Sequence, residues 1–298
     1  MNSVAIAVEL LLNLKADLGE GPIWHPPSQR LYWVNIMQGE VHVYDPATNT
    51  DRSVSVGQAV GTVVPRRSGG VMLALNHGFA SLDLDSGMLT MLQDPEKYLP
   101  ENRFNDGKCD PAGRFWAGTM LNGAGESDPP HGSLYSLDAN HQVKHRLGHI
   151  RISNGIAWSL DKTTMYYVDS PDRRVDAFDY DEATGEIGNR RVAVAVAREY
   201  GMPDGMTIDA EGMLWVAGWG GGQVSRWDPS NGKFLETIQV PASQSSACAF
   251  GGPNLDELYI TSARRGLDAA TLAREPLAGG LFVARPGVRG TEAFEFAG

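Results

Sequence analysis

Residues 204–216 read Asp-Gly-Met-Thr-Ile-Asp-Ala-Glu-Gly-Met-Leu-Trp-Val, and this phrase decides the fold because the chain repeats it. It consists of one residue followed by glycine, a short apolar stretch, a turn, and a second stretch rich in aromatic and β-branched residues. The related phrases begin at six dipeptides: Glu20-Gly21, Val60-Gly61, Asp106-Gly107, Asn154-Gly155, Asp204-Gly205 and the degenerate Ser246-Ala247. They recur at intervals of about 40–50 residues, which is the length of one four-stranded propeller blade.

The repeats predict an all-β fold. We expect a single domain over residues 1–298, a six-bladed β-propeller whose blades are four-stranded antiparallel sheets. The short strands are rich in β-branched and aromatic residues, and no convincing amphipathic helix interrupts them. The last repeat has three good strands, while residues 4–14 form an apolar stretch outside the repeats. This N-terminal strand should therefore close the last blade and remove an exposed sheet edge.

Composition and charge exclude several classes of protein. The 298 residues contain 25 Lys and Arg against 36 Asp and Glu, a formal net charge of −11, so nucleic acid is not an expected partner. Cys109 and Cys248 are far apart and outside any C-x-x-C spacing, which indicates neither a disulfide framework nor a zinc knuckle. Residues 4–14 lack a basic flank, carry Glu9 and Asn13, and are too short to span a membrane. We expect a cytoplasmic protein with no membrane partner.

The residue before each repeated glycine carries the chemistry. In a propeller the first strand of each blade runs along the central channel, so equivalent positions form a ring around the axis. Four of these six positions hold a carboxylate or an amide: Glu20, Asp106, Asn154 and Asp204. Buried charges need partners or a cation, and hard oxygen ligands suit Ca²⁺, Mg²⁺ or Mn²⁺ and also accept Zn²⁺ or Fe²⁺. The alternative interpretation is that Asn-Gly and Asp-Gly are ordinary turn dipeptides.

At these residues the chain resembles the SMP-30/gluconolactonase/LRE family. The resemblance covers nearly the whole chain and is carried by these motifs: Gly19-Glu20-Gly21-Pro22, Arg103-Phe104-Asn105-Asp106-Gly107-Lys108, Gly118-Thr119-Met120, Ile152-Ser153-Asn154-Gly155 and Pro203-Asp204-Gly205-Met206. It implies a lactonase with one divalent metal ion on the propeller axis, held by Glu20, Asn154 and Asp204. It also implies that Arg103 and Asn105 contact the substrate. Asp106 shares the repeat phase but is not a ligand in the family, so we expect it behind the metal site.

The chain departs from the family pattern at one position. Some members carry an acidic substrate-contacting residue shortly after Gly-Thr-Met, where this chain has Gly123. Glu126 would replace that contact only if its loop folds back over the site. The resemblance therefore does not identify which sugar lactone is preferred.

A specific mechanism follows from the resemblance. We expect a monomer that hydrolyses aldonolactones such as gluconolactone, with Ca²⁺ as the metal and Asp204 as general base. Arg103 would orient the sugar, and Asn105 would hold a hydroxyl group or the attacking water. Two alternatives remain: a non-catalytic calcium-binding regulatory protein, and an organophosphate or aryl-ester hydrolase.

Overall fold

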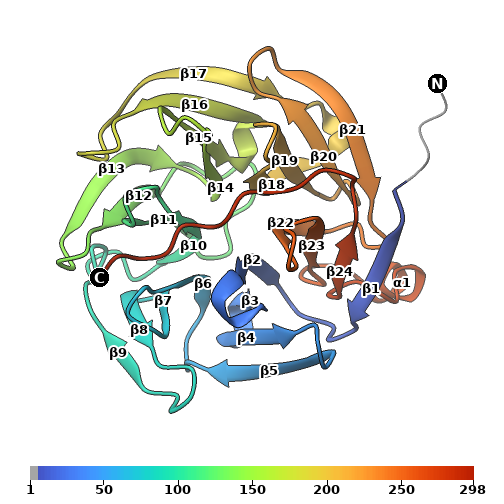
Figure 1. Cartoon of the computed structure of the whole chain (residues 1–298), viewed down its shortest axis with the longest axis horizontal. Helices are drawn as coiled ribbons and strands as arrows, with labels where there is room; N and C mark the ends of the chain where they lie inside the picture. Colours follow the sequence, from blue (N-terminus) through green and yellow to red (C-terminus); the bar gives the residue numbers. More distant parts are fainter. Residues whose placement is uncertain (1–5) are drawn as a thin grey trace.

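The computed structural model describes residues 6–298 and arranges their strands in a ring of six four-stranded sheets (Figure 1). Every pairing within a sheet is antiparallel. The innermost strands of neighbouring sheets contact one another around the ring. The predicted six-bladed β-propeller is confirmed.

Five blades follow the chain without interruption, from the innermost strand to the outermost. Blade 1 contains β2 (Gly19–His25), β3 (Arg30–Asn35), β4 (Glu40–Asp45) and β5 (Thr50–Ser55). Blade 2 contains β6 (Val60–Pro65), β7 (Val71–Leu75), β8 (Gly78–Leu82) and β9 (Leu89–Met91). Blade 3 contains β10 (Asn102–Cys109), β11 (Phe115–Leu121), β12 (Gly132–Leu137) and β13 (Val143–Ile150). Blade 4 contains β14 (Ser153–Trp158), β15 (Thr164–Asp169), β16 (Arg174–Tyr180) and β17 (Ile187–Ala195). Blade 5 contains β18 (Met202–Ile208), β19 (Leu214–Trp219), β20 (Gln223–Asp228) and β21 (Lys233–Gln239).

Blade 6 joins the two ends of the chain. Its strands are β22 (Ser245–Gly251), β23 (Glu257–Ser262), β24 (Leu281–Ala284) and β1 (Val8–Leu12). Leu10 of β1 pairs with Phe282 of β24, so the N-terminal strand closes the last blade as predicted. The predicted strand ran from Val4 to Leu14, and its first two residues lie outside the described part of the chain.

Helices are few and short. The 3₁₀ turns are η1 (Pro26–Ser28), η2 (Ile36–Gln38), η3 (Ser170–Asp172) and η4 (Arg198–Tyr200), and the single α-helix of residues 6–298 is α1 (Ala269–Arg274). Asp268 caps α1 through a hydrogen bond from the Thr271 amide. Within the described residues, no helix is long and apolar enough to cross a membrane.

Burial explains why the inner strands read as continuous apolar runs. Every residue of β14 is buried because blades pack against it from both sides, whereas β21 at the rim has only Ile238 buried and its other residues exposed or partly buried. Only the inner strands thus bring their side chains to the channel. A polar residue on one of them is a costly exception that needs an explanation.

Each inner strand carries a β-bulge at the repeated dipeptide. The register shifts lie between Glu20 and Ile23, Val60 and Thr62, Phe104 and Gly107, Ser153 and Ile156, Pro203 and Met206, and Ser245 and Ala247. A bulge bends the strand locally and re-aims one side chain. The dipeptides therefore lie inside strands, and the turn interpretation is wrong.

The glycine of the dipeptide is needed because neighbouring inner strands approach closely at the bulge. A Cβ atom on Gly155 would lie 2.6 Å from the Asp204 carbonyl oxygen of the next blade. A Cβ atom on Gly205 would overlap Ala247 of the blade after that. These contacts set the spacing at which the residues before each glycine face one another.

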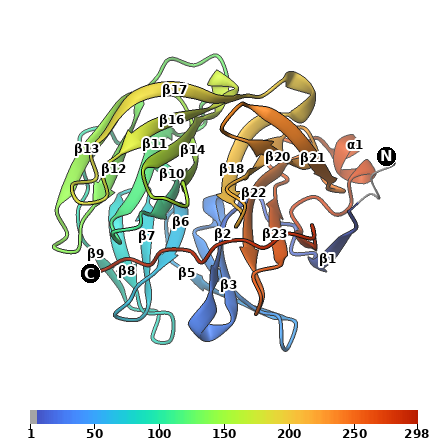
Figure 2. The same ribbon diagram turned by 45° about the horizontal axis from the view of Figure 1, so that its top comes forward.

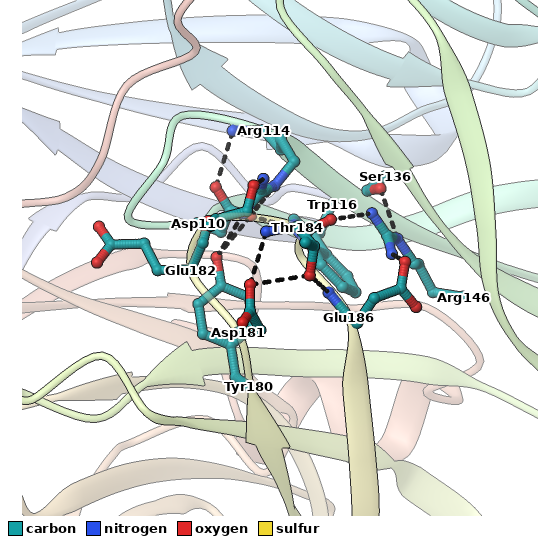
Figure 3. Close-up of polar contacts among 11 residues, drawn as sticks. Asp110, Arg114, Trp116, Ser136, Arg146, Tyr180, Asp181, Glu182, Thr184 and Glu186 are labelled. Carbon is teal, nitrogen blue, oxygen red and sulfur yellow. Dashed lines mark hydrogen bonds and ion pairs between the residues drawn. The ribbon is translucent and has the colours of Figure 1, made fainter.

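A buried aspartate binds blade 3 to blade 4 (Figure 3). Asp110 is fully buried, and its Oδ2 accepts hydrogen bonds from Arg114 Nε at 2.6 Å, Trp116 Nε1 at 2.8 Å and the Tyr180 hydroxyl at 2.8 Å. Arg114 also donates to the Ala183 carbonyl at 3.1 Å, in the turn between β16 and β17. Breaking a buried ionic cluster of this kind by removing one partner typically costs about 3–5 kcal/mol.

The C-terminal segment 285–298 crosses one face of the propeller, as both views show (Figures 1 and 2). Its backbone hydrogen bonds reach four blades at Leu255, Ala210, Pro65 and Gly113. It passes over a cavity of about 290 Å³ at the carboxyl ends of the inner strands, and residues 291–294 line that cavity. This end of the channel is therefore covered, which leaves the opposite end as the open mouth.

Removal of β1 tests the closure of the ring. Deleting residues 1–14 exposes β24 as an unpaired edge and removes the partners of residues 281–284, so we expect loss of the cooperative unfolding transition. Urea denaturation followed by circular dichroism and tryptophan fluorescence measures this. A truncated protein with the wild-type midpoint and slope would contradict the proposed role of β1.

Candidate functional site

The open end of the channel holds a cavity of about 400 Å³. Glu20 of β2, Asn154 of β14 and Asp204 of β18 line it, together with Arg103 and Asn105 of β10. All five are buried and lie near the amino-terminal ends of the inner strands. The structure therefore brings every residue of the predicted site into one cavity, although these residues come from four blades.

Asn154 is oriented by a chain of hydrogen bonds. Its Nδ2 donates to Ser170 Oγ at 2.7 Å, and Ser170 Oγ donates to the Pro203 carbonyl at 2.7 Å. Because the amide nitrogen is held in this way, Oδ1 is the acceptor, and it accepts a hydrogen bond from Asn105 Nδ2 at 2.9 Å. The oxygen of Asn154 is thereby presented at the site.

Glu20 and Asp204 are buried carboxylates with few compensating contacts. Glu20 Oε2 accepts only a 3.1 Å hydrogen bond from the Gly21 amide, and Asp204 Oδ1 has no hydrogen-bond partner within residues 6–298. Burial, with the charge of Asp106 second, raises the pKa of Glu20 to about 8. Burial and the charge of Glu20 raise the pKa of Asp204 well above its usual range. Each carboxyl group is thus costly to ionise in this buried, acidic part of the channel.

This donor set fits a divalent cation. Two carboxylates and one amide oxygen are hard ligands, and an unpartnered buried Asp204 Oδ1 is the sort of atom that a metal would satisfy. No three His, Cys, Asp or Glu side chains of the described chain are grouped so as to hold a metal. A metal centre at this position would therefore need the Asn154 oxygen as its third ligand. Three protein ligands leave room for water or substrate.

Asp106 lies farther along the channel. It does not line the open cavity but a much smaller void of about 10 Å³ that it shares with Lys108. Its Oδ1 accepts a 2.7 Å hydrogen bond from the Gly107 amide. The two other ring positions, Val60 and Ser246, also do not line the open cavity. The structure places Asp106 behind the three candidate ligands, where the family pattern implies it should be.

Arg103 is a buried guanidinium without an ion-pair partner among the described residues. Its Nη1 donates to the Phe104 carbonyl at 3.0 Å and to Asn105 Oδ1 at 2.6 Å, while Nε is buried and has no partner there. Burial, and then the charge of Arg265, lower the pKa of Arg103 to about 10. This side chain keeps unused donors beside the candidate metal centre.

Asn105 lines the cavity but makes most of its hydrogen bonds within the protein. Its Nδ2 donates both to the Ser153 carbonyl at 2.8 Å and to Asn154 Oδ1, and its Oδ1 accepts from Arg103. Both N–H donors are therefore used within the protein, which leaves one lone pair on Oδ1 for a ligand. Asn105 links Arg103 to the metal-ligand candidate Asn154 and holds the two in fixed relation.

The loop after β11 folds back over the cavity. Gly123 and Glu126 both line it, so Glu126 does reach the site. Its carboxylate, however, pairs with Arg173, with Nε to Oε1 at 3.0 Å and Nη2 to Oε2 at 3.3 Å. The hydrogen bond and charge of Arg173 hold the pKa of Glu126 below its usual value. Glu126 thus anchors the loop to Arg173, and both of its carboxylate oxygens already accept hydrogen bonds from that residue.

A second ring of residues surrounds the mouth, and sequence reasoning found only part of it. Met120, Ser170, Trp219 and Arg265 lie at or just beyond the ends of the second strands of blades 3 to 6, and all line the cavity. The repeat period does not select these positions, because they follow the inner-strand residues of their blades by 14, 16, 15 and 19 residues, respectively. Ser170 and Arg265 therefore carry no sequence signal that marks them as part of the site.

Comparison with known proteins shows relatives over nearly the whole chain. Residues 18–264 match the family model for the SMP-30/gluconolactonase/LRE-like region. Human regucalcin is 42% identical over 300 residues, with 99% of each chain covered. A solved luciferin-regenerating enzyme superposes with a TM-score of 0.93 at 36% identity, covering 98% of this chain and all of that one. A calcium-binding protein, regucalcin, from Agrobacterium tumefaciens superposes with a TM-score of 0.92 at 31% identity, with 98% of each chain covered.

The raised pKa of Glu20 predicts how the stability of the metal-free protein depends on pH. Between the ordinary pKa of 4.5 and the raised value of about 8, the native state keeps a proton that the unfolded state has released. The free energy of unfolding should therefore fall as pH rises through this window. In Glu20→Gln the fall should be smaller, and at pH 8 the variant should be more stable than the wild type.

Urea denaturation in EDTA at several pH values between 5 and 9 measures this effect. Glu101→Gln, at an exposed glutamate outside the cavity, is the matched control and should follow the wild type. Identical pH profiles for Glu20→Gln and the wild type would show that Glu20 is not held protonated.

Proposed function

Because this chain belongs to the SMP-30/gluconolactonase/LRE-like family, we propose that it is a metal-dependent lactonase that hydrolyses sugar lactones of the aldonolactone type, such as gluconolactone. The observation that carries the proposal is the meeting of Glu20, Asn154 and Asp204 in one open cavity beside an unpaired Arg103. A structural scaffold has no need for two buried, poorly compensated carboxylates on its axis.

The proposed metal is Ca²⁺, held by Glu20, Asn154 and Asp204. A relative described as a calcium-binding protein supports this choice, and the all-oxygen donor set suits Ca²⁺, Mg²⁺ or Mn²⁺ and accepts Zn²⁺ or Fe²⁺. When bound, the cation would polarise the lactone carbonyl and lower the pKa of a bound water.

The side chains of this chain supply the remaining functions. Asp204 accepts a proton from the attacking water as general base, through the carboxylate oxygen that does not hold the metal. The water oxygen bonds to the carbonyl carbon, the ring C–O bond breaks, and the ring oxygen leaves as a hydroxyl after taking up a proton. Each turnover consumes one water and releases one proton from the new carboxylic acid. Arg103 donates to substrate oxygens, and Asn105 positions it.

A second candidate function is non-catalytic calcium binding, favoured by the description of the Agrobacterium relative. A regulatory protein of that kind would bind calcium tightly at cytosolic concentrations, whereas three protein ligands predict weak binding. Isothermal titration with Ca²⁺ distinguishes the two functions, because tight binding favours the regulatory protein and weak binding favours the lactonase. An organophosphate or aryl-ester hydrolase is the third candidate, tested by the same assay with those esters.

Replacement of the proposed ligands tests the lactonase. Asp204→Asn and Glu20→Gln should each lower kcat/KM for gluconolactone by about a hundredfold or more after metal depletion and re-addition, because each removes a ligand charge and the first also removes the base. A pH-indicator assay run with Ca²⁺, Mn²⁺, Mg²⁺ and Zn²⁺ measures this. Glu101→Gln should match the wild type. Wild-type turnover with stoichiometric metal in both ligand variants would rule out this site.

A further inference from the structure

The cavity carries charges of both signs. Glu20, Asp204 and Arg103 lie at its floor, on inner strands, while Arg265 lines it from a loop and is partly exposed. We propose that the lactone bound here carries a carboxylate at the end remote from its carbonyl group, as in a lactone of an aldaric acid. This inference rests on the proposed lactonase function and names its substrate class.

The two arginines are neighbours. Arg265 is the residue whose positive charge contributes most, after burial, to lowering the pKa of Arg103. Two adjacent guanidinium groups repel each other, and the charges of Glu20 and Asp204 offset this at Arg103 without forming an ion pair with it, so a further anion beside the two arginines would be favourable. A substrate carboxylate would supply that anion.

Arg103 retains the donors that such a carboxylate needs. Only its Nη1 has hydrogen-bond partners, both from β10, and its buried Nε has none among the described residues. A guanidinium matches a planar carboxylate with two parallel N–H donors, and Nε with the outer Nη atom presents such a pair. A buried, unpaired guanidinium is costly, and an anionic ligand would remove that cost.

Arg265 reaches the cavity from the loop that follows β23. Its Nη1 donates to Asp17 Oδ2 at 3.0 Å, which fixes the side chain from outside because Asp17 does not line the cavity. The side chain remains 41% exposed, and its other nitrogens have no partner within residues 6–298. Arg265 is thus held at the mouth with donors still available.

Among residues 6–298, no acidic side chain that lines the cavity forms an ion pair with Arg103 or Arg265. Gly123 also lines the cavity, and it offers no side chain to a substrate hydroxyl group. Glu126 lines the cavity but is paired with Arg173. Arginines with free donors and no ion pair to a lining acid favour a carboxylate end of the substrate over a hydroxymethyl end.

Two lactones that share one ring test the proposal. D-glucaro-1,4-lactone and D-glucono-1,4-lactone differ only at C6, which is a carboxylate in the first and a hydroxymethyl group in the second. We expect wild-type kcat/KM to be at least about tenfold higher for the glucarolactone. Arg265→Gln should reduce that ratio towards one, Arg265→Lys should keep part of it, and Arg264→Gln, at a neighbour that does not line the cavity, should leave it unchanged.

A binding measurement tests the carboxylate preference independently of the proposed lactonase activity. In metal-depleted protein, D-glucarate should raise Tm more than D-gluconate at equal ionic strength, and Arg265→Gln should abolish the difference. If gluconolactone is hydrolysed as well as glucarolactone, or if Arg265→Gln keeps the wild-type ratio, the carboxylate proposal is overturned while the lactonase stands. If neither lactone is hydrolysed with any metal, the proposed lactonase function is wrong. The comparison of glucarate with gluconate binding then tests by itself whether the cavity prefers a ligand with a second carboxylate.

Discussion

The burial of two carboxyl groups, Glu20 and Asp204, on the channel axis is the constraint around which this propeller is organised. Neither is neutralised by an ion pair within the described chain, and burial raises the pKa of both. Such an arrangement persists only if the surrounding structure prevents the two residues from moving apart or turning towards water. The ring provides this restraint, because the residues lie on inner strands of different blades that are packed on both sides.

Several devices hold those blades in place. The pairing of β1 with β24 closes the ring, and the C-terminal segment ties four blades together across the covered face. The buried Asp110 cluster joins blade 3, which carries Arg103 and Asn105, to blade 4, which carries Asn154 (Figure 3). At the inner-strand glycines, the backbones of adjacent blades pack so closely that no side chain would fit between them. Stability elsewhere in the fold thus offsets the unfavourable site, as is common where function requires strained or uncompensated groups.

Much of this organisation could be predicted from sequence, because residues that recur at the blade period occupy equivalent positions around the propeller axis. Once the period was known, the position before each glycine had to face the axis, and the ring of Glu20, Asp106, Asn154 and Asp204 followed. Resemblance to the family separated Asp106 from the other three. The period did not reveal the hydrogen-bond partners of the site residues. Ser170 orients Asn154 from a 3₁₀ turn, and Asn105 donates both of its amide hydrogens to other groups of the protein. Such details depend on side-chain geometry between blades, which the spacing of residues does not encode.

The most direct test of the central claim is a crystal structure of the protein soaked with Mn²⁺, read by anomalous scattering, with a Ca²⁺ structure at high resolution beside it. The account predicts one strong anomalous peak on the propeller axis, within coordination distance of Glu20, Asn154 Oδ1 and Asp204. In the Ca²⁺ structure the metal–oxygen distances should be about 2.3–2.6 Å. Density for the metal at another place in the chain, or an axis that stays empty at saturating metal, would contradict it.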